Sequence, residues 1–187
     1  RWGQGDFPFL WVQLPNFKTR NADPNAASAW AHMRESMAGT LSLPNTGMAT
    51  TIDIGEAKDI HPKNKQDAGA RLANWALAEF YGKSDVTATG PMYASHKIKG
   101  NTVTVQFKHA TGLQAKEARA VSGFALAGAD KKFHWASATI AEDGQVRVTC
   151  AKVKKPVAVR YAWGDNPDCN LVNKAKLPAT PFRTDKW

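Results

Sequence analysis

The chain of 187 residues is poor in cysteine, with Cys150 and Cys169 alone. These two lie in neither a CxxC pair nor a Cys/His pattern of zinc spacing, so we expect no metal site. They could form a disulfide, as in a secreted protein, or two separate buried thiols. No apolar run approaches the roughly 18 residues that a membrane helix requires, and we expect no membrane partner.

Other familiar signals are also missing from the sequence. No signal peptide is visible, because Arg1 leads directly into WGQGDFPFLWVQL, which is typical of the middle of a domain. We therefore expect upstream sequence that was removed or belongs to another chain. The segment GQGD at 3–6 is too short and misplaced for a phosphate loop. There is no GxSxG elbow, so the serines offer no recognisable nucleophile.

Charge of one sign is in excess, since 25 basic side chains stand against 16 acidic ones and give a formal net charge of +9. That excess could indicate nucleic-acid binding. The lysines are scattered, however, and no aromatic residues are arranged with them in a recognisable motif. We therefore favour a solvated basic surface suited to anionic substrates, and expect no nucleic-acid partner.

Residues 1–84 have the pattern of a parallel α/β sheet. Short apolar runs predict strands, and helical spacing after the Asp23-Pro24 pair and after Pro62 predicts two helices. The expected order is a strand at 9–14, a helix from 24 to 39, a strand at 48–54, and a helix from 62 until Gly82. The apolar face of the first helix would contain Ala26, Trp30, Met33 and Met37. That of the second helix would contain Ala68, Leu72, Trp75, Ala76 and Phe80. Two strands are too few for a stable sheet, so others must come from missing sequence or a partner chain.

Residues 85–187 change character, because alternating segments separated by turn signals predict an antiparallel β-sandwich. The tail from 166 to 187 contains three prolines and is expected to be irregular and to lie across the rest of the protein. The expected strands are 92–97, 102–107, 123–127, 133–140, 146–151 and 157–163.

The segment TGMATTIDIGEAKDIHPKNK at 46–65 contains the strongest candidate for chemistry, His61. It predicts a buried strand, an acidic loop and then His61 just before a proline-started helix. The imidazole would lie at the carboxyl end of a parallel strand, where open α/β sheets bind their ligands. Because the ordinary pKa of histidine is near neutrality and the positive end of the helix favours the neutral ring, His61 could act as a general base. The alternative is a histidine that only caps the helix.

A catalytic histidine is commonly oriented by a carboxylate on its other ring nitrogen. Asp59 is the better candidate, since residues two apart in an extended backbone face the same side. Asp53, at the end of the expected strand, is the second. Either acid could instead be an ordinary loop or turn residue.

The remaining candidates are weaker. His32, His96, His109 and His134 have no second ligand at metal spacing, so structural or surface roles are favoured. Seven tryptophans, Trp2 among them, would suit sugar binding, but buried packing is the more common role of each. Trp163 and Asn166 are weak binding candidates.

Several long segments resemble the carboxyl-terminal part of sialate O-acetylesterases, which are SGNH-type hydrolases. They extend over nearly the whole chain, and IDIG…DIHPKNK followed by AVRYAWGDNP is the most specific part. The segments are WGQGDFPFLWVQLPNF (2–17), LPNTGMATTIDIGEAKDIHPKNKQDAGARLA (43–73), VSGFALAGADKKFHWASATI (121–140), VRYAWGDNPDCNL (159–171) and the final LPATPFRTDKW.

The resemblance implies the carboxyl-terminal part of an SGNH-type, flavodoxin-like parallel α/β/α sheet in residues 1–84, followed by an antiparallel β-sandwich domain in residues 85–187. It implies a serine esterase that removes O-acetyl groups from sialic acid or other sugars, without a cofactor, in a secreted, periplasmic or lysosomal protein. His61 matches the catalytic histidine of the family's IHP motif. The family's serine and oxyanion-hole residues belong to blocks that precede WGQGDFPF, so an amino-terminal fragment or chain would supply them.

One position departs from the family pattern. Many SGNH hydrolases have aspartate three residues before the histidine, where this chain has Lys58, and Asp59 lies two before. A serine–histidine pair with an unconventional third member is therefore plausible. The second interpretation is a non-catalytic carbohydrate-binding or structural β-sandwich module with a remnant α/β half, which would explain the tryptophans and the missing serine equally well.

Overall fold

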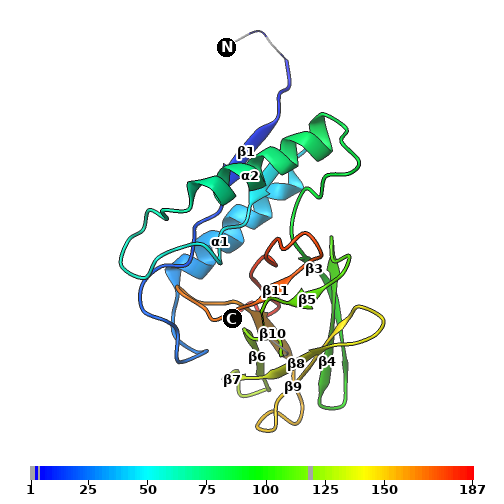
Figure 1. Cartoon of the computed structure of the whole chain (residues 1–187). Helices are drawn as coiled ribbons and strands as arrows, with labels where there is room; N and C mark the ends of the chain where they lie inside the picture. The colour runs from blue at the N-terminus through cyan, green and yellow to red at the C-terminus, as the bar shows by residue number, and fades with distance from the viewer. Residues whose placement is uncertain (1–2, 4, 118–119) are drawn as a thin grey trace.

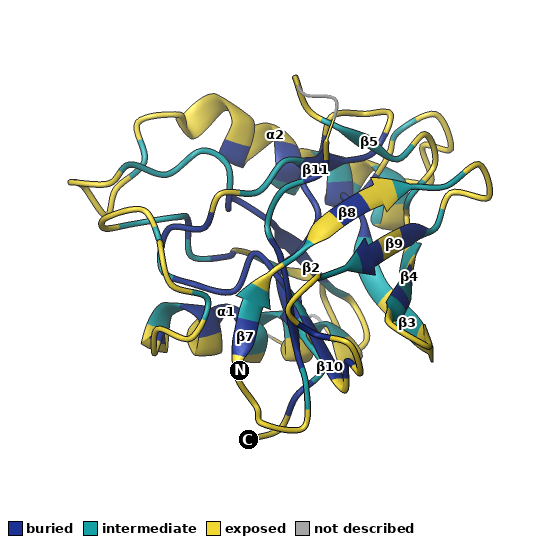
Figure 2. Ribbon diagram, turned by 90° about the horizontal axis from the view of Figure 1, so that it is seen from below, coloured by how far each residue is buried: buried dark blue, intermediate teal, exposed yellow. Residues whose placement is uncertain are grey.

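The computed structural model describes residues 3, 5–117 and 120–187, so Trp2 lies outside the described residues. Two long helices and a short strand pair lie at one end of the molecule, and the antiparallel strands lie at the other (Figure 1). Buried residues follow the central strands, and the connecting loops are mostly exposed (Figure 2). No helix in the described ranges is long and apolar enough to cross a membrane.

The α/β part contains two parallel strands, β1 (Phe9–Val12) and β2 (Thr46–Ala49), with Phe9 opposite Thr46. Helix α1 (Ala29–Gly39) continues into the 3-10 turn η1 (Thr40–Ser42), and α2 (Lys65–Trp75) continues into the π-helical turn η2 (Ala76–Phe80). Helix α2 packs directly on β2. A Cβ on Gly47 would come within 2.8 Å of the Trp75 ring, so this close packing requires glycine.

Helix α1 differs from the sequence expectation. Asp23 and Pro24 form a turn instead of a helix start, because the Asp23 carboxylate accepts hydrogen bonds from the backbone and side chain of Asn25. The helix begins at Ala29, and Ser28 caps it by accepting a hydrogen bond from the Ala31 amide. Ala26 is exposed and precedes the helix, and Met33 is 53% exposed, whereas Ala31 and Arg34 are buried. The expected apolar face was therefore wrong at Ala26 and Met33.

The second strand and the second helix are also shorter than expected. Strand β2 stops at Ala49 instead of Ile54, because the next residues turn to make side-chain contacts with neighbouring loops. Helix α2 begins at Lys65 instead of Pro62, with the Asn64 side chain accepting a hydrogen bond from the Asp67 amide. Residues 50–64 therefore form one long loop.

The sandwich consists of two antiparallel sheets, and all six expected segments contain strands. Three further strands in the described ranges are only two residues long. The predicted 133–140 segment divides at Ala136, and its two halves join different sheets. One sheet has the strand order β12 (Phe182–Arg183), β10 (Ala158–Tyr161), β6 (Phe124–Ala127) and β7 (Phe133–Trp135). The other sheet has the order β3 (Met92–Lys99), β4 (Thr102–Lys108), β9 (Val146–Thr149) and β8 (Ser137–Ile140). A separate small pair joins β5 (Gln114–Ala115) to β11 (Leu171–Val172).

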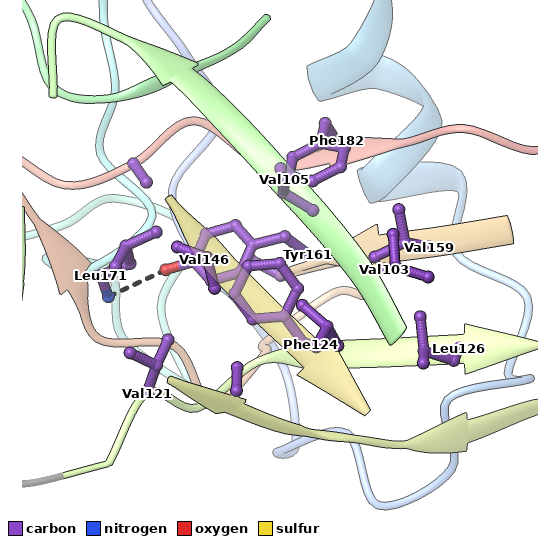
Figure 3. Close-up of a cluster of buried hydrophobic side chains, with 14 of the residues drawn as sticks. Val103, Val105, Val121, Phe124, Leu126, Val146, Val159, Tyr161, Leu171 and Phe182 are labelled. Atoms are coloured by element: carbon purple, nitrogen blue, oxygen red, sulfur yellow. Dashed lines mark hydrogen bonds between the residues drawn. The ribbon is translucent and has the colours of Figure 1, made fainter. Parts of the chain in front are cut away.

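The hydrophobic core lies between these sheets (Figure 3). Valines at alternate positions of β4 and β9 face large side chains of β6 and β10, as expected for strands with one buried face. The Tyr161 hydroxyl accepts a hydrogen bond from the Leu171 amide at 3.0 Å, and burial raises the pKa of Tyr161. The labelled core residues are Val103, Val105, Val121, Phe124, Leu126, Val146, Val159, Tyr161, Leu171 and Phe182.

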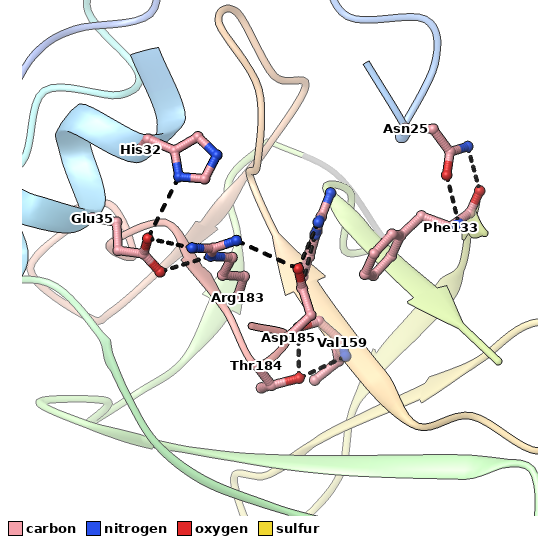
Figure 4. Close-up of polar contacts among 9 residues, drawn as sticks. Asn25, His32, Glu35, Phe133, Val159, Arg183, Thr184 and Asp185 are labelled. Carbon is pink, nitrogen blue, oxygen red and sulfur yellow. Dashed lines mark hydrogen bonds and ion pairs between the residues drawn. The ribbon is translucent and has the colours of Figure 1, made fainter. Parts of the chain in front are cut away.

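The carboxyl-terminal tail is more than the irregular segment that the sequence predicted, because it completes the sandwich. Phe182 stacks on Tyr93 with ring centroids 4.6 Å apart, and it lies in the same core as Tyr161. Arg183 makes a two-bond ion pair with Glu35 of α1, and Asp185 makes another with Arg160 (Figure 4). The tail therefore joins the sandwich to α1.

The two cysteines are separate thiols, as in the second of the two expected alternatives, but both residues are partly exposed instead of fully buried. Burial raises the pKa of the Cys169 thiol to about 12.

Arg34 joins the two halves of the chain. Its side chain is completely buried and donates hydrogen bonds of 2.6–2.9 Å to four backbone carbonyls. Two of these carbonyls follow β1 (Leu14 and Pro15), and two directly precede the tail (Gly164 and Asp165). Burial lowers the pKa of Arg34 to about 10, so the group remains protonated at neutral pH.

We expect Arg34→Met to lower the free energy of unfolding by about 3–5 kcal/mol, because four carbonyls would lose a hydrogen bond and two of them, Leu14 and Gly164, have no other donor among the described residues. Urea unfolding of the purified protein measures this loss. The matched control is Arg147→Met on an exposed position of β9, which should change stability by no more than about 0.5 kcal/mol. Equal effects of the two substitutions would contradict a structural role for the buried guanidinium.

Candidate functional site

The loop 50–64 joins β2 to α2 and is fixed at its beginning. The Thr51 hydroxyl donates to the Gln13 carbonyl at 2.6 Å, next to the end of β1. The Thr50 hydroxyl lies 3.0 Å from that of Thr180 in the tail. Ile52 is buried in the core of the sandwich. The first residues of the loop therefore contact both halves of the molecule.

Asp53 belongs to an ion pair inside this loop. Arg71 of α2 donates to both Asp53 carboxylate oxygens, at 2.6 and 2.9 Å, and also to the Thr50 carbonyl at 2.7 Å. Both side chains are largely buried. Since its two oxygens accept from Arg71, Asp53 holds the loop on α2, and the structure does not bring it to His61.

The middle of the loop is fixed by Asn16 and Phe17, which follow β1. The Gly55 amide donates to the Asn16 side chain at 2.7 Å, and Glu56 forms a parallel bridge with Phe17. A side chain on Gly55 would overlap the Asn16 carbonyl oxygen, so only glycine fits here. Glu56 also contacts the Lys63 amide and ammonium group across the loop, at 3.3 and 3.4 Å.

Asp59 and His61 lie together at the exposed tip of the loop. The His61 amide donates to the Asp59 carboxylate at 2.8 Å, and the same oxygen lies 3.3 Å from His61 Nδ1. The amide hydrogen bond is the main cause of a lowered pKa of Asp59, which stays ionised at neutral pH. The side chains of His61 and Asp59 are 82% and 49% exposed.

His61 lies farther from regular structure than the sequence predicted. It is twelve residues after the end of β2 and four before the first residue of α2. The field of a helix end weakens within about one turn, so the expected effect of the helix on the imidazole is small in this geometry. The Asp59 carboxylate, 3.3 Å from Nδ1, is the charged group beside the ring.

This arrangement is suited to proton transfer. With Nδ1 facing an ionised carboxylate, Nε2 is the ring nitrogen that can take a proton from an alcohol. Within the described ranges no serine hydroxyl donates to the His61 ring, and Ser28 instead bonds the Asp165 carboxylate. Among the same residues no group of three potential His, Cys, Asp or Glu ligands could hold a metal ion.

The weaker sequence candidates lie elsewhere. His32 packs edge-on against Trp163, and His96 lies 2.7 Å from the Tyr93 hydroxyl. Trp163 and Asn166 are buried, and Asn166 donates to the Lys18 carbonyl at 2.6 Å. Both are therefore packing residues and not an exposed binding surface.

Sequence reasoning missed the residues that hold the loop. Arg71 could have been found, because it is a charged residue on the expected inward face of α2, between Ala68 and Trp75. Its spacing from Asp53 gives no local signal, since the two are far apart in sequence. Asn16 carries no recognisable motif.

The sequence is similar to known esterases over most of its length. The chain is 26% identical to a sialate O-acetylesterase of Mus musculus over 197 residues, which is 96% of this chain and 36% of that protein. It is likewise 26% identical to a sialate O-acetylesterase of Homo sapiens, over 94% of this chain and 36% of that protein. This chain is similar to the sialate O-acetylesterases. The resemblance expected from the sequence is thereby confirmed.

A solved structure extends the similarity to the fold. The crystal structure of a carbohydrate acetylesterase from Xanthomonas citri matches with a TM-score of 0.89 and 46% sequence identity, over 96% of this chain and 41% of that chain. The present chain thus spans about a third of the length of the curated sialate O-acetylesterases that it matches. No family model matches the sequence.

The two candidate acids should respond differently to substitution. We expect Asp53→Ala to lower the free energy of unfolding by about 3 kcal/mol, because it leaves Arg71 largely buried without its partner. Asp59→Ala should change it by no more than about 0.5 kcal/mol, since Asp59 is exposed. Urea titration of both variants measures the contrast, and an equal loss would contradict the assignment of Asp53 to the ion pair.

Gly55→Ala should move the loop, because the new methyl group cannot occupy the position of the Asn16 carbonyl. We expect a loss of about 1–3 kcal/mol in stability and faster amide hydrogen exchange across 50–64. Gly69→Ala on α2 is the control, since nothing lies within 4 Å of the position that its new methyl group would take, and it should not destabilise the protein. Unchanged exchange in Gly55→Ala would show that the contact with Asn16 does not fix the loop.

Proposed function

We propose that this chain is the carboxyl-terminal part of a serine-type carbohydrate esterase that removes O-acetyl groups from sialic acid or other acetylated sugars. In this proposal His61 is the catalytic base and Asp59 orients it. The observation that carries the proposal is the contact between Asp59 and His61 Nδ1 in a chain similar to sialate O-acetylesterases. The full activity requires a serine from an amino-terminal segment or chain.

The open edge of the small parallel sheet supports this arrangement. Strand β1 pairs only with β2 among the described residues, and Phe9 on β1 is 59% exposed. Phe7 and Val12 are exposed nearby along the chain. Exposed apolar side chains on an unpaired strand edge are unfavourable in water and favour pairing with a further strand. We propose that the rest of an SGNH-type sheet pairs here, with residues 1–84 as part of that domain and 85–187 as the sandwich.

The proposed reaction has two acyl-transfer steps. The serine oxygen attacks the acetyl carbonyl carbon while its proton passes to His61 Nε2. The tetrahedral oxyanion, stabilised by amide donors of the amino-terminal segment, collapses with cleavage of the bond to the sugar oxygen, which takes the proton from His61. Water then attacks the acetyl-serine with His61 again as base, releasing acetate and restoring the serine. Asp59 remains ionised throughout and stabilises the protonated ring.

The test is turnover of p-nitrophenyl acetate by the protein together with its upstream segment. We expect His61→Ala to lower kcat by about 10³-fold or more, and Asp59→Ala by about 10- to 100-fold, with unchanged thermal unfolding because both residues are exposed. His96→Ala, in a histidine of the sandwich, is the control and should retain full turnover. Near-normal activity of His61→Ala would exclude His61 from the mechanism.

The second candidate is a non-catalytic carbohydrate-binding or structural module, favoured by the high exposure of His61 and by the absence of a serine contact to its ring in the described residues. Mass spectrometry of the intact native protein distinguishes the two. An accompanying amino-terminal segment with esterase activity supports the enzyme. A stable, inactive chain of this length alone supports the module. As a location we propose the secreted, periplasmic or lysosomal compartments.

A further inference from the structure

Two neighbouring hollows on the sandwich share His134 and Lys152 in their walls, and we name them together the basic groove. They measure about 540 and about 300 Å³. The larger lies between Asn25, Phe133 and Trp135 and the end of β9. The smaller lies against residues 152–155. None of the residues lining the groove belongs to the loop 50–64.

The charge of the basic groove is predominantly positive. Four lysines line it, and all four are exposed. Two carboxylates, Asp23 and Asp130, also line it, so the lysines exceed the acids by two charges. The carboxylates accept hydrogen bonds from the Asn25 amide at 2.8 Å and the Lys132 amide at 3.3 Å, respectively. The lysines are Lys132, Lys152, Lys154 and Lys155.

Trp135 provides a fixed aromatic surface in the same groove. It is 42% exposed, yet its indole N–H donates to the Ala22 carbonyl at 2.9 Å, which holds the ring in place. The adjacent Phe133 backbone is fixed by two hydrogen bonds with the Asn25 side chain, at 2.7 and 2.9 Å (Figure 4). An exposed, pre-positioned indole can stack on the apolar face of a sugar ring at little conformational cost.

We propose that the basic groove binds an anionic polysaccharide, with Trp135 stacking on a sugar ring and the lysines pairing with its carboxylates. The inference extends the proposed function, because it assigns the acidic class of glycan and a binding surface on the sandwich, and it rests on that function for the choice of carbohydrate. Fixed aromatic surface and positive charge occur together in this groove, and a carboxylated sugar chain matches both. A nucleic acid is the competing polyanion and is one outcome of the test.

The experiment measures binding of polygalacturonate to the full protein by isothermal titration calorimetry at low salt, with neutral glucomannan and an oligodeoxynucleotide as comparison ligands. We expect Lys152→Ala/Lys154→Ala to weaken binding about 10-fold and Trp135→Ala by a similar factor, whereas Trp135→Phe should keep most of the affinity. The matched control, Lys97→Ala/Lys99→Ala on β3, removes the same charge outside the groove and should change affinity less than about 2-fold.

Four results would overturn the proposal. They are equal weakening by the control pair, equal affinity for the neutral glycan, tighter binding of the oligonucleotide, and no measurable binding of polygalacturonate. Turnover of p-nitrophenyl acetate by the groove variants separates this inference from the esterase proposal. If the groove variants lose polygalacturonate binding but keep full turnover, the binding role of the basic groove is supported. If the protein binds polygalacturonate but has no esterase activity, the binding role stands and the esterase proposal is contradicted.

Discussion

The buried guanidinium of Arg34 is the interaction on which the arrangement of the two halves depends. Its four hydrogen bonds end on backbone carbonyls from two segments about 150 residues apart. Among the described residues, the Leu14 and Gly164 carbonyls have no other donor, whereas Pro15 also accepts from Trp30 and Asp165 from the Phe17 amide. Removing such a charge from water is unfavourable, and only a complete set of acceptors offsets that cost. Carbonyl acceptors also require a fixed backbone. The turn after β1 and the turn at 164–165 are therefore held in one geometry with respect to α1.

The position of the candidate site depends on the backbone segments that Arg34 holds together. Asn16 and Phe17, which anchor the middle of the loop 50–64, directly follow the carbonyls that Arg34 binds. Arg71 fixes the beginning of the same loop through Asp53. The base of the loop is thus held by buried polar contacts, while its tip presents Asp59 and His61 to solvent. Because the His61 ring is exposed to solvent, a hydroxyl group from another segment can reach it.

The sequence predicted the elements better than it predicted the contacts among them. Alternating valines marked β4 and β9, because one face of each strand is buried and the other is not. The two-residue strands β5, β11 and β12 are too short to give a periodic signal. The start of α1 was misjudged because Asp23 bonds its own turn, and Arg34 was overlooked because a charged residue on a helix is normally exposed. His61 and Asp59 could be paired from their spacing, whereas the pairing of Asp53 with Arg71 depends on tertiary structure.

The boundary predicted at residue 84 divides the chain but not its hydrophobic core. Ile52 lies before the boundary and packs into the same core as Val105 and Phe182. Polar contacts cross it too, from Thr50 to the tail and from Glu35 to Arg183. Because the first residues of the histidine loop are packed against the sandwich, a change in the packing of the sandwich would be transmitted to the base of that loop. The sandwich is therefore a structural support for the candidate site as well as a surface that could bind a glycan.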